Sequence, residues 1–136
     1  MCGFQVTPIP VEHSVPAVGY HIASPDGDSF FYTGDTNGVG LAEIWESLDP
    51  NLVILEVTYP NSQESLASQV FHMTPSRVET ELLKLRNGNG SRPLPPLVAI
   101  HLDPMGEQDI SAELAALADK LGASIVTGHE DMVIEL

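Results

Sequence analysis

Short apolar runs alternate with amphipathic stretches along the chain, and Gly, Pro, Asn and Asp stand at most of the joints between them. Runs with strand character occupy residues 4–13, 18–24, 29–34, 52–57 and 97–102, and two shorter ones occupy 124–127 and 132–136. Stretches with helical spacing lie between several of these runs. This alternation is typical of an α/β or layered α+β domain, because a sheet must bury its apolar face against helices or against a second sheet.

The strand-like runs differ in the places that they suit within a sheet. The opening run contains Pro8 and Pro10, which lack an N–H group, so we expect an edge or bent strand. The next two runs flank the turn sequence at residues 25–28, which predicts a β-hairpin. The continuous apolar run at 52–57 predicts a buried strand, and the turn-like residues 128–131 predict a hairpin between the last two strands.

Three stretches have helical spacing. Residues 41–48 carry apolar side chains at i, i+3, i+4 and i+7 and end at Asp49. A second helix is expected to begin at Thr74 and Pro75, because threonine suits the N-cap and proline suits the first helical position. The third is expected at 110–121, ending before Gly122. Between the second helix and the run at 97–102, residues 87–96 predict a mobile loop.

The charge balance narrows the classes of partner. The chain has 136 residues, enough for one domain, and its formal net charge is −14. Such acidity argues against a free-standing protein that binds nucleic acid or an anionic membrane surface. It is compatible with a bound cation, which would offset several carboxylates locally.

Cysteine content and targeting signals narrow the chemistry further. Cys2 is the sole cysteine, so neither an intrachain disulfide nor a cysteine-rich zinc site can form, and a metal would have to use histidine and carboxylate ligands. The sequence has no stretch of about 20 apolar residues and no signal-peptide pattern at its start. These features predict a cytoplasmic protein.

Three apolar runs end in side chains that can bind metal, namely His13, Asp35 and His101. Strand ends are where layered α/β proteins assemble sites, because strands hold the side chains rigidly. The separations of 22 and 66 residues are too long for a local motif. Each residue therefore has an alternative structural role: His13 as a hydrogen-bonded histidine at a strand end, Asp35 at the start of an Asx-turn, and His101 as a capping residue.

Five segments appear in an order that resembles a known family: H-S-V-P-A-V-G-Y, F-Y-T-G-D-T, L-E-V-T-Y-P, F-H-M-T-P and V-A-I-H-L-D-P. Together they resemble the second half of the metallo-β-lactamase fold over about residues 11–136. Within that superfamily the sequence is most similar to the branch that holds tRNase Z and the class II cyclic-nucleotide phosphodiesterases. The resemblance implies half of an αββα sandwich, with a mixed sheet, about three helices and two metal ions, usually zinc, at one edge.

The resemblance also implies roles for individual residues. His13 corresponds to a ligand of the first metal, Asp35 to the aspartate that bridges both metals, and His101 to a ligand of the second. His72 corresponds to a proton donor beside the metals, with an alternative as a histidine that merely precedes the helix at Thr74. Glu56 and Thr36 would not bind the metals themselves but would support the residues that do. His21 and His129 are expected to bind no metal, and Asp103 is left open as a residue that orients His101 or contacts substrate.

The chain departs from the family in one respect. The motif H-x-H-x-D-H, which supplies four ligands in the first half of family members, does not occur in it. Residues 1–136 thus correspond to the second half of the domain and supply at most three ligands. We expect the missing motif to be encoded upstream of Met1, and we expect the isolated chain to bind zinc weakly and to be inactive.

These features predict a metal-dependent hydrolase that cleaves phosphodiesters once its missing half is present. The charge of −14 favours a cyclic nucleotide or another small phosphodiester over tRNA. The alternative is a truncated, non-catalytic module that binds a partner or forms a homo-oligomer through the unburied face of its sheet. A complementing N-terminal half is one such partner.

Overall fold

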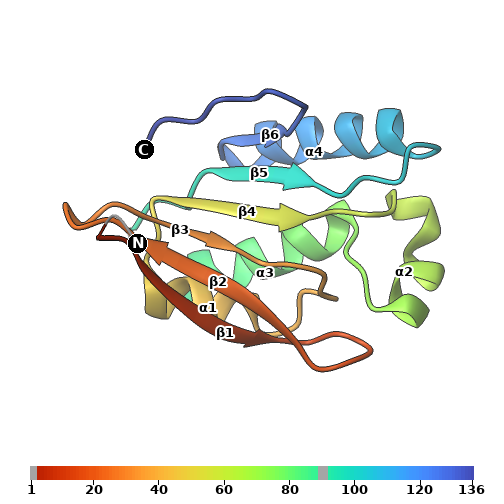
Figure 1. Ribbon diagram of the computed structural model, residues 1–136. Coiled ribbons are helices and arrows are strands. Elements are labelled where there is room, and N and C mark those ends of the chain that lie inside the picture. The colour runs from red at the N-terminus through yellow and green to blue at the C-terminus, as the bar shows by residue number, and fades with distance from the viewer. Residues whose placement is uncertain (1–2, 89–91) are drawn as a thin grey trace.

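The computed structural model describes residues 3–88 and 92–136. Its centre is a six-stranded sheet in which the strands lie in chain order (Figure 1). The first three strands pair antiparallel and the last four pair parallel, so the sheet is mixed, as expected. The strands are β1 (Gln5–Val11), β2 (Ala17–Ala23), β3 (Ser29–Tyr32), β4 (Leu52–Glu56), β5 (Leu97–Ile100) and β6 (Ile125–Thr127).

The antiparallel part of the sheet confirms two predictions. β1, which contains Pro8 and Pro10, is an edge strand that pairs with β2. Strands β2 and β3 form the predicted hairpin, and its turn is closed by the N–H of Ser24, which donates to the carbonyl of Asp28 at 2.8 Å. Gly27 takes a φ of 101° there, which a residue with a side chain rarely adopts.

Helices α1 (Leu41–Leu48), α3 (Pro75–Gly88) and α4 (Glu107–Leu121) lie on one side of the sheet (Figure 1). The predicted stripe of α1 is buried at Leu41 and Trp45, and Asp49 caps the helix in a left-handed conformation. Helix α4 begins three residues earlier than predicted and ends at Gly122, as expected. The helical face of the sheet therefore carries the core of the molecule.

Helix α3 begins where the sequence predicts. Thr74 accepts the N–H of Arg77 on its Oγ1 at 3.4 Å, so it caps the helix that Pro75 opens. The helix continues through Gly88, so the first two residues of the loop expected at 87–96 are helical. Residues 89–91 of that loop lie outside the described residues, as does Cys2, and the predicted mobility of the loop remains a prediction.

One helical segment was not predicted. A short 3₁₀-helix η1 (Asn61–Gln63) leads into α2 (Glu64–Val70), so the described residues form four α-helices where about three were expected. The sequence of α2 is mostly polar, and Ala67 is the residue that it buries among those described. Such a segment carries no apolar stripe from which to predict a helix.

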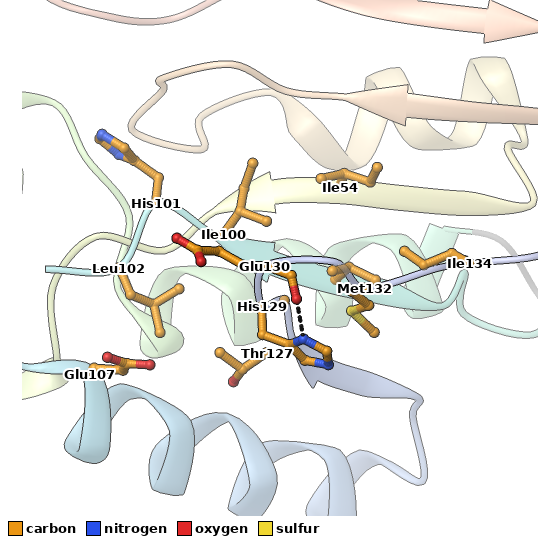
Figure 2. Close-up of a pocket in the computed structure, with 12 residues that line it drawn as sticks. Ile54, Ile100, His101, Leu102, Glu107, Thr127, His129, Glu130, Met132 and Ile134 are labelled. Carbon is orange, nitrogen blue, oxygen red and sulfur yellow. Dashed lines mark hydrogen bonds between the residues drawn. The ribbon is translucent and has the colours of Figure 1, made fainter. Parts of the chain in front are cut away.

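The prediction of a final strand at 132–136 is wrong. The turn before it forms, since the N–H of Met132 donates to the carbonyl of His129, but the residues after it have no regular structure. Met132 and Ile134 instead lie near Ile54 of β4 and Val98 of β5, with which they line a pocket (Figure 2). The alternation of apolar residues in this tail thus reflects contact with the sheet surface rather than strand pairing.

The two faces of the sheet differ in what covers them. Register partners on one face are Phe31, Val53, Leu97 and Ile125, all buried beneath the helices. The opposite face, which we name the open face, carries a second row of register partners: Tyr20, Tyr32, Ile54, Val98 and Val126. In this row Tyr20, Tyr32 and Val126 are 41%, 37% and 44% exposed. None of the helices in the described parts of the chain is long and apolar enough to cross a membrane.

Candidate metal centre

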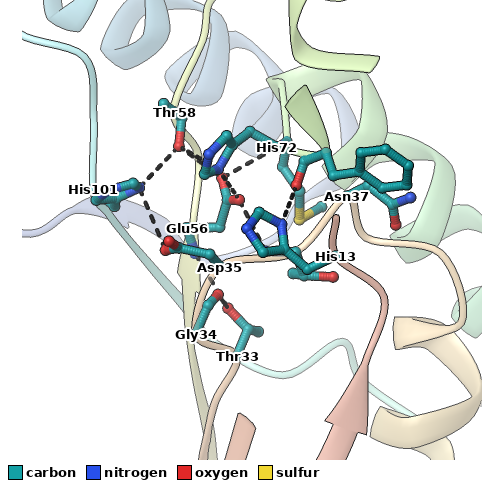
Figure 3. Close-up of polar contacts among 12 residues, drawn as sticks. His13, Thr33, Gly34, Asp35, Asn37, Glu56, Thr58, His72 and His101 are labelled. Atoms are coloured by element: carbon teal, nitrogen blue, oxygen red, sulfur yellow. Dashed lines mark hydrogen bonds and ion pairs between the residues drawn. The ribbon is translucent and has the colours of Figure 1, made fainter. Parts of the chain in front are cut away.

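Four predicted site residues meet at one end of the sheet, although they come from distant parts of the sequence (Figure 3). His13 follows β1, Asp35 follows β3, and His101 follows β5 directly, while His72 lies between α2 and α3. His13, Asp35 and His72 bring potential ligand atoms within 4.8 Å of one another, and so do Glu56, His72 and His101. The carboxyl ends of the strands therefore converge on a single polar cluster.

His72 lies between the other two histidines of this cluster. Its ring centroid is 5.3 Å from that of His13 and 5.5 Å from that of His101. Asp35 closes the group on the side of His101, with 3.6 Å between Asp35 Oδ1 and His101 Nδ1. Both of these side chains are about half exposed, so a ligand can reach them from solvent.

Glu12, which the sequence analysis did not single out, positions His13 beside Asp35. Its carbonyl accepts hydrogen bonds from the Thr36 hydroxyl at 2.9 Å and from the Asn37 N–H at 3.0 Å. Its carboxylate also accepts one from the Asn37 side chain at 3.0 Å. These bonds tie the loop after β1 to the loop after β3.

Glu56 is the buried anchor of the cluster, with a side chain 1% exposed. Its Oε1 accepts hydrogen bonds from the Thr36 N–H at 3.0 Å and from His72 Nδ1 at 2.7 Å. Its Oε2 accepts them from the Thr58 hydroxyl at 2.9 Å and from the Met73 N–H at 3.1 Å. These four hydrogen bonds leave neither oxygen of the carboxyl group without a partner.

In two of the imidazoles a hydrogen-bond acceptor shows which ring nitrogen carries a proton. His13 Nδ1 lies 3.0 Å from the carbonyl of Phe71, and a carbonyl can only accept, so this nitrogen carries a proton. His72 Nδ1 carries a proton for the same reason, since it faces the Glu56 carboxylate. Both residues therefore keep Nε2 for another partner. An imidazole whose Nδ1–H is held by an acceptor is the usual form of a histidine that binds metal through Nε2.

The structure distinguishes between the alternative roles that the sequence left open for His13, Asp35 and His72. His13 is a hydrogen-bonded histidine after a strand, and this bond is compatible with a ligand role. The Asx-turn after β3 belongs to Asn37, whose Oδ1 accepts the N–H of Val39, and not to Asp35. His72 does not cap α3, because Thr74 does so.

His101 has a backbone conformation that is unusual for a residue other than glycine. Its φ is 60°, in the left-handed region, immediately after β5. A non-glycine residue in this region carries a cost of about 1–3 kcal/mol and persists only where surrounding contacts fix it. Its Nδ1 lies 3.0 Å from the Thr58 hydroxyl. Asp103 does not orient this ring in the structure; its Oδ1 accepts the N–H of Met105 at 3.3 Å.

The remaining histidines lie apart from the cluster, as expected. His21 is on the helical face of β2, paired in register with Phe31, and its buried Nε2 has no hydrogen-bond partner among the described residues. His129 Nδ1 lies 2.8 Å from the carbonyl of Glu130 (Figure 2). Neither belongs to a group of potential metal ligands within the described part of the chain.

Sequence reasoning missed Glu12, Thr58 and the backbone groups of Phe71 and Met73. The two backbone groups leave no trace in the sequence, because any residue could supply them. Thr58 stands two residues after Glu56, and on an extended chain that spacing places two side chains on the same side. This spacing is the one signal that could have indicated a joint role.

A pocket of about 620 Å³ borders the cluster at His101 (Figure 2). Apolar side chains of the open face and of the C-terminal tail form one part of its wall, including Ile54, Ile100 and Met132. Glu107 and Glu130 contribute carboxylates. The metal-competent cluster therefore opens onto the same side of the sheet that no helix covers in the described structure.

The donor set of the cluster fits a divalent transition metal. Imidazole nitrogens and carboxylate oxygens are ordinary zinc ligands, and the second ring nitrogens of His13 and His72 are already engaged by acceptors. Two sets of side chains lie close enough to hold a metal ion: His13, Asp35 and His72, and Glu56, His72 and His101.

Comparisons with known proteins identify the family and the fold of the chain. Residues 1–126 match the family described as the beta-lactamase superfamily domain. No characterised protein sequence matches the chain significantly.

Three solved structures of similar fold share 18–21% sequence identity with the chain. Unliganded yeast PDE1 matches with 20% identity and a TM-score of 0.77, over 96% of this chain and 45% of its own. The short form of human tRNase Z matches with 21% identity and a TM-score of 0.66, over 98% and 43%. Zn²⁺-bound PqqB from Methylobacterium extorquens matches with 18% identity and a TM-score of 0.65, over 100% and 48%. The chain spans less than half the length of these proteins. It belongs to the beta-lactamase superfamily and has the architecture of a metallo-β-lactamase half-domain.

Proposed function

We propose that this chain forms part of a metal-dependent hydrolase that cleaves small phosphodiesters. The observation that carries the proposal is the convergence of three histidines and Asp35 at one end of the sheet, from four separate segments. The hydrogen bonds behind these residues favour the same role, because they orient the rings before any ligand binds. Membership of a superfamily that includes hydrolases supports it.

His13, Asp35 and His101 would hold two divalent metal ions, with zinc the best match to the ligand types. Bound there, the metals would supply Lewis-acid activation of a water molecule and of the phosphoryl group. His72 would hold a proton on Nε2 and donate it to the leaving oxygen, because Glu56 already occupies its Nδ1. Glu56 would also stabilise the positive charge of His72 when both ring nitrogens carry protons.

The proposed substrate is a cyclic nucleotide or a similar small phosphodiester. A net charge of −14 disfavours the approach of tRNA, whose backbone would be repelled at long range. Both yeast PDE1 and human tRNase Z share the fold, so the fold does not decide between these substrates. A small phosphodiester carries less charge than a tRNA and suits the acidic surface better. The acidity and the single cysteine fit a protein of the reducing cytoplasm.

The proposal includes a second polypeptide segment that carries the missing H-x-H-x-D-H motif. The open face offers a place for it, because its row of register partners is apolar across five strands and exposed at Tyr20, Tyr32 and Val126. An apolar sheet face of this kind is normally covered by another layer. A completing segment that packs there would bring its ligands to the edge where His13, Asp35 and His101 lie.

Metal binding and hydrolysis test the proposal together. The chain would be titrated with zinc against a competing chelator, alone and mixed with a polypeptide that carries the motif, and the mixture assayed on a cyclic nucleotide and on a precursor tRNA. We expect weak binding by the chain alone, and hydrolysis of the cyclic nucleotide by the mixture. His13→Ala and Asp35→Ala should abolish metal retention, whereas the matched control His21→Ala should not. Equal effects of the three substitutions would refute the site, and preferential cleavage of tRNA would refute the substrate class.

A second candidate is a non-catalytic module that binds a partner or a second copy of itself. The exposed row on the open face favours it, since exposed apolar patches often mark interfaces. Sedimentation of the chain at several concentrations separates the two candidates. A stable homodimer that Tyr32→Lys dissociates, with no zinc binding at any concentration tested, would favour the module over the hydrolase.

A further inference from the structure

Thr58 occupies the centre of the polar cluster, two residues after Glu56, and is 8% exposed. Its Oγ1 lies 2.9 Å from Glu56 Oε2, 3.0 Å from His101 Nδ1 and 3.3 Å from His72 Nδ1. One hydroxyl group thus touches the buried carboxylate and two of the three histidines (Figure 3). It is the contact through which the buried part of the cluster reaches the half-exposed His101.

The backbone of Thr58 is held from two directions. Its N–H donates to the carbonyl of Met73 at 3.2 Å, and its carbonyl accepts the N–H of Asp103 at 2.9 Å. The first bond leads to the loop that carries His72, and the second to the loop that carries His101. The hydroxyl therefore has a fixed position relative to both rings.

A count of protons decides the direction of each hydrogen bond. Glu56 accepts hydrogen bonds from three other donors, and its Oε2 also accepts the Thr58 hydroxyl at 2.9 Å. The single proton of the Thr58 hydroxyl therefore goes to Glu56 Oε2. Toward His101 the hydroxyl can offer only a lone pair, so His101 Nδ1 must be the donor.

We propose that Thr58 is a positioning residue that holds His101 in the tautomer protonated on Nδ1, so that the lone pair of Nε2 is free to bind metal. This rests on the proposed function, in which His101 is a metal ligand. Glu56 directs the hydroxyl proton of Thr58, and Thr58 in turn directs the ring proton of His101. The buried carboxylate thus acts on His101 through one intervening side chain.

No other described contact of His101 fixes its tautomer as strongly. Asp35 Oδ1 is 3.6 Å from His101 Nδ1, too long for a good hydrogen bond. The ring is about half exposed, so water can pair with either nitrogen once Thr58 is removed. In contrast, His13 Nδ1 faces the Phe71 carbonyl and does not depend on Thr58.

The first test reads the tautomer directly, in the metal-free chain. Long-range ¹H–¹⁵N correlation spectra would be recorded at about pH 8, where ordinary imidazoles are neutral. We expect His101 to show the Nδ1–H pattern in the wild type and in Thr58→Ser, which keeps the hydroxyl. Thr58→Val, which replaces it with a methyl group, should move His101 toward the Nε2–H tautomer. His13 should keep the Nδ1–H pattern in every spectrum and serves as an internal control.

The second test measures zinc affinity of the same proteins by competition with a chelator. Thr58→Val should bind zinc about 10-fold more weakly or worse, whereas Thr58→Ser should bind within a factor of about 3 of the wild type. Thr80→Val, which removes a hydroxyl bonded to the carbonyl of Ser76 on the exposed surface of α3, is the matched control and should bind like the wild type.

Three results would overturn the proposal. The first is an Nε2–H pattern for His101 in the wild type, which needs no variant to fold. The second is an unchanged Nδ1–H pattern in Thr58→Val, and the third is a loss of the pattern in Thr58→Ser equal to that in Thr58→Val. Neither test uses a phosphodiester, so a failure of hydrolysis would refute the proposed function and leave the role of Thr58 standing.

Discussion

Glu56 Oε1 lies 2.7 Å from His72 Nδ1, and this contact joins the end of β4 to the loop between α2 and α3. The carboxylate is 1% exposed and the imidazole 16% exposed, so the pair is largely removed from water. A buried carboxylate is costly unless hydrogen bonds and charge compensate it. The cluster meets this condition with donors from four different residues.

The first prediction concerns Glu56→Gln. The amide keeps the shape of the side chain but has one acceptor atom, so its NH₂ group must face one or more of the four donors. We expect the free energy of unfolding to fall by about 2–3 kcal/mol, the cost of losing hydrogen bonds to a buried charge. Urea denaturation of the metal-free chain measures it. Glu135→Gln, on the exposed tail, should change stability by less than about 0.5 kcal/mol. Equal midpoints for the two variants would contradict the prediction.

Residues whose role is local were predictable from the sequence. Pro8 and Pro10 place β1 at the edge because of their own missing N–H groups, and Thr74 caps α3 through its own hydroxyl. Segments stabilised by distant contacts were not predictable. The polar helix α2 contributes a single buried side chain, Ala67, among those described, and the tail at 132–136 has the alternation of a strand without a strand to pair with.

The site likewise contains residues that could be named from the sequence and groups that could not. The sequence analysis named His13, Asp35 and His101 as metal-competent side chains at strand ends, and the family resemblance added His72 and brought the four together, because separations of tens of residues carry no local signal. The structure brings all four together. It also adds groups that spacing could not reveal, such as the carbonyl of Phe71 behind His13 and the loop contacts of Glu12. These groups act through backbone atoms or through a loop whose path the sequence does not specify.

The second prediction compares two substitutions of His101, whose φ is 60°. Glycine adopts this conformation without steric cost, whereas alanine retains the Cβ atom that causes the steric cost. We expect His101→Gly to be more stable than His101→Ala by about 1 kcal/mol, although both remove the ring. Thermal or urea unfolding of the two variants provides the measurement. The strain at this position would be disproved by an alanine variant as stable as the glycine variant.

The third prediction concerns acid stability and Glu64. Burial raises the pKa of this carboxyl, but hydrogen bonds from Thr74 and Arg77 and the nearby guanidinium charge outweigh burial and hold the pKa below the usual 4.5. A carboxyl with a lowered folded-state pKa stabilises the fold above its unfolded pKa and loses this effect as the pH falls through the folded one. Glu64 should therefore stabilise the fold at neutral pH and progressively less below about pH 4.5.

Unfolding of the wild type and Glu64→Gln over a range of pH tests this sign. The wild type should be the more stable of the two at pH 7, and the difference should shrink on acidification. The side chain is 39% exposed, so solvent screening keeps the effect modest. A gap between wild type and Glu64→Gln that widens in acid would reverse the sign and contradict the prediction.

The last prediction concerns Gly19 on β2. This strand pairs with β3, which leads to Asp35. A Cβ at this position would lie 2.6 Å from the carbonyl oxygen of Tyr32 and 2.9 Å from the ring of Phe31. Because a backbone carbonyl cannot move without disturbing the pairing of β2 with β3, Gly19→Ala should lower the free energy of unfolding by about 2 kcal/mol. The matched control is Gly88→Ala at the end of α3, where a Cβ meets side-chain oxygens of Glu46 at an ordinary 3.8 Å. That variant should unfold at the same urea concentration as the wild type or a higher one. If Gly19→Ala unfolded together with Gly88→Ala, the close approach of β2 to β3 would not be a constraint on the fold.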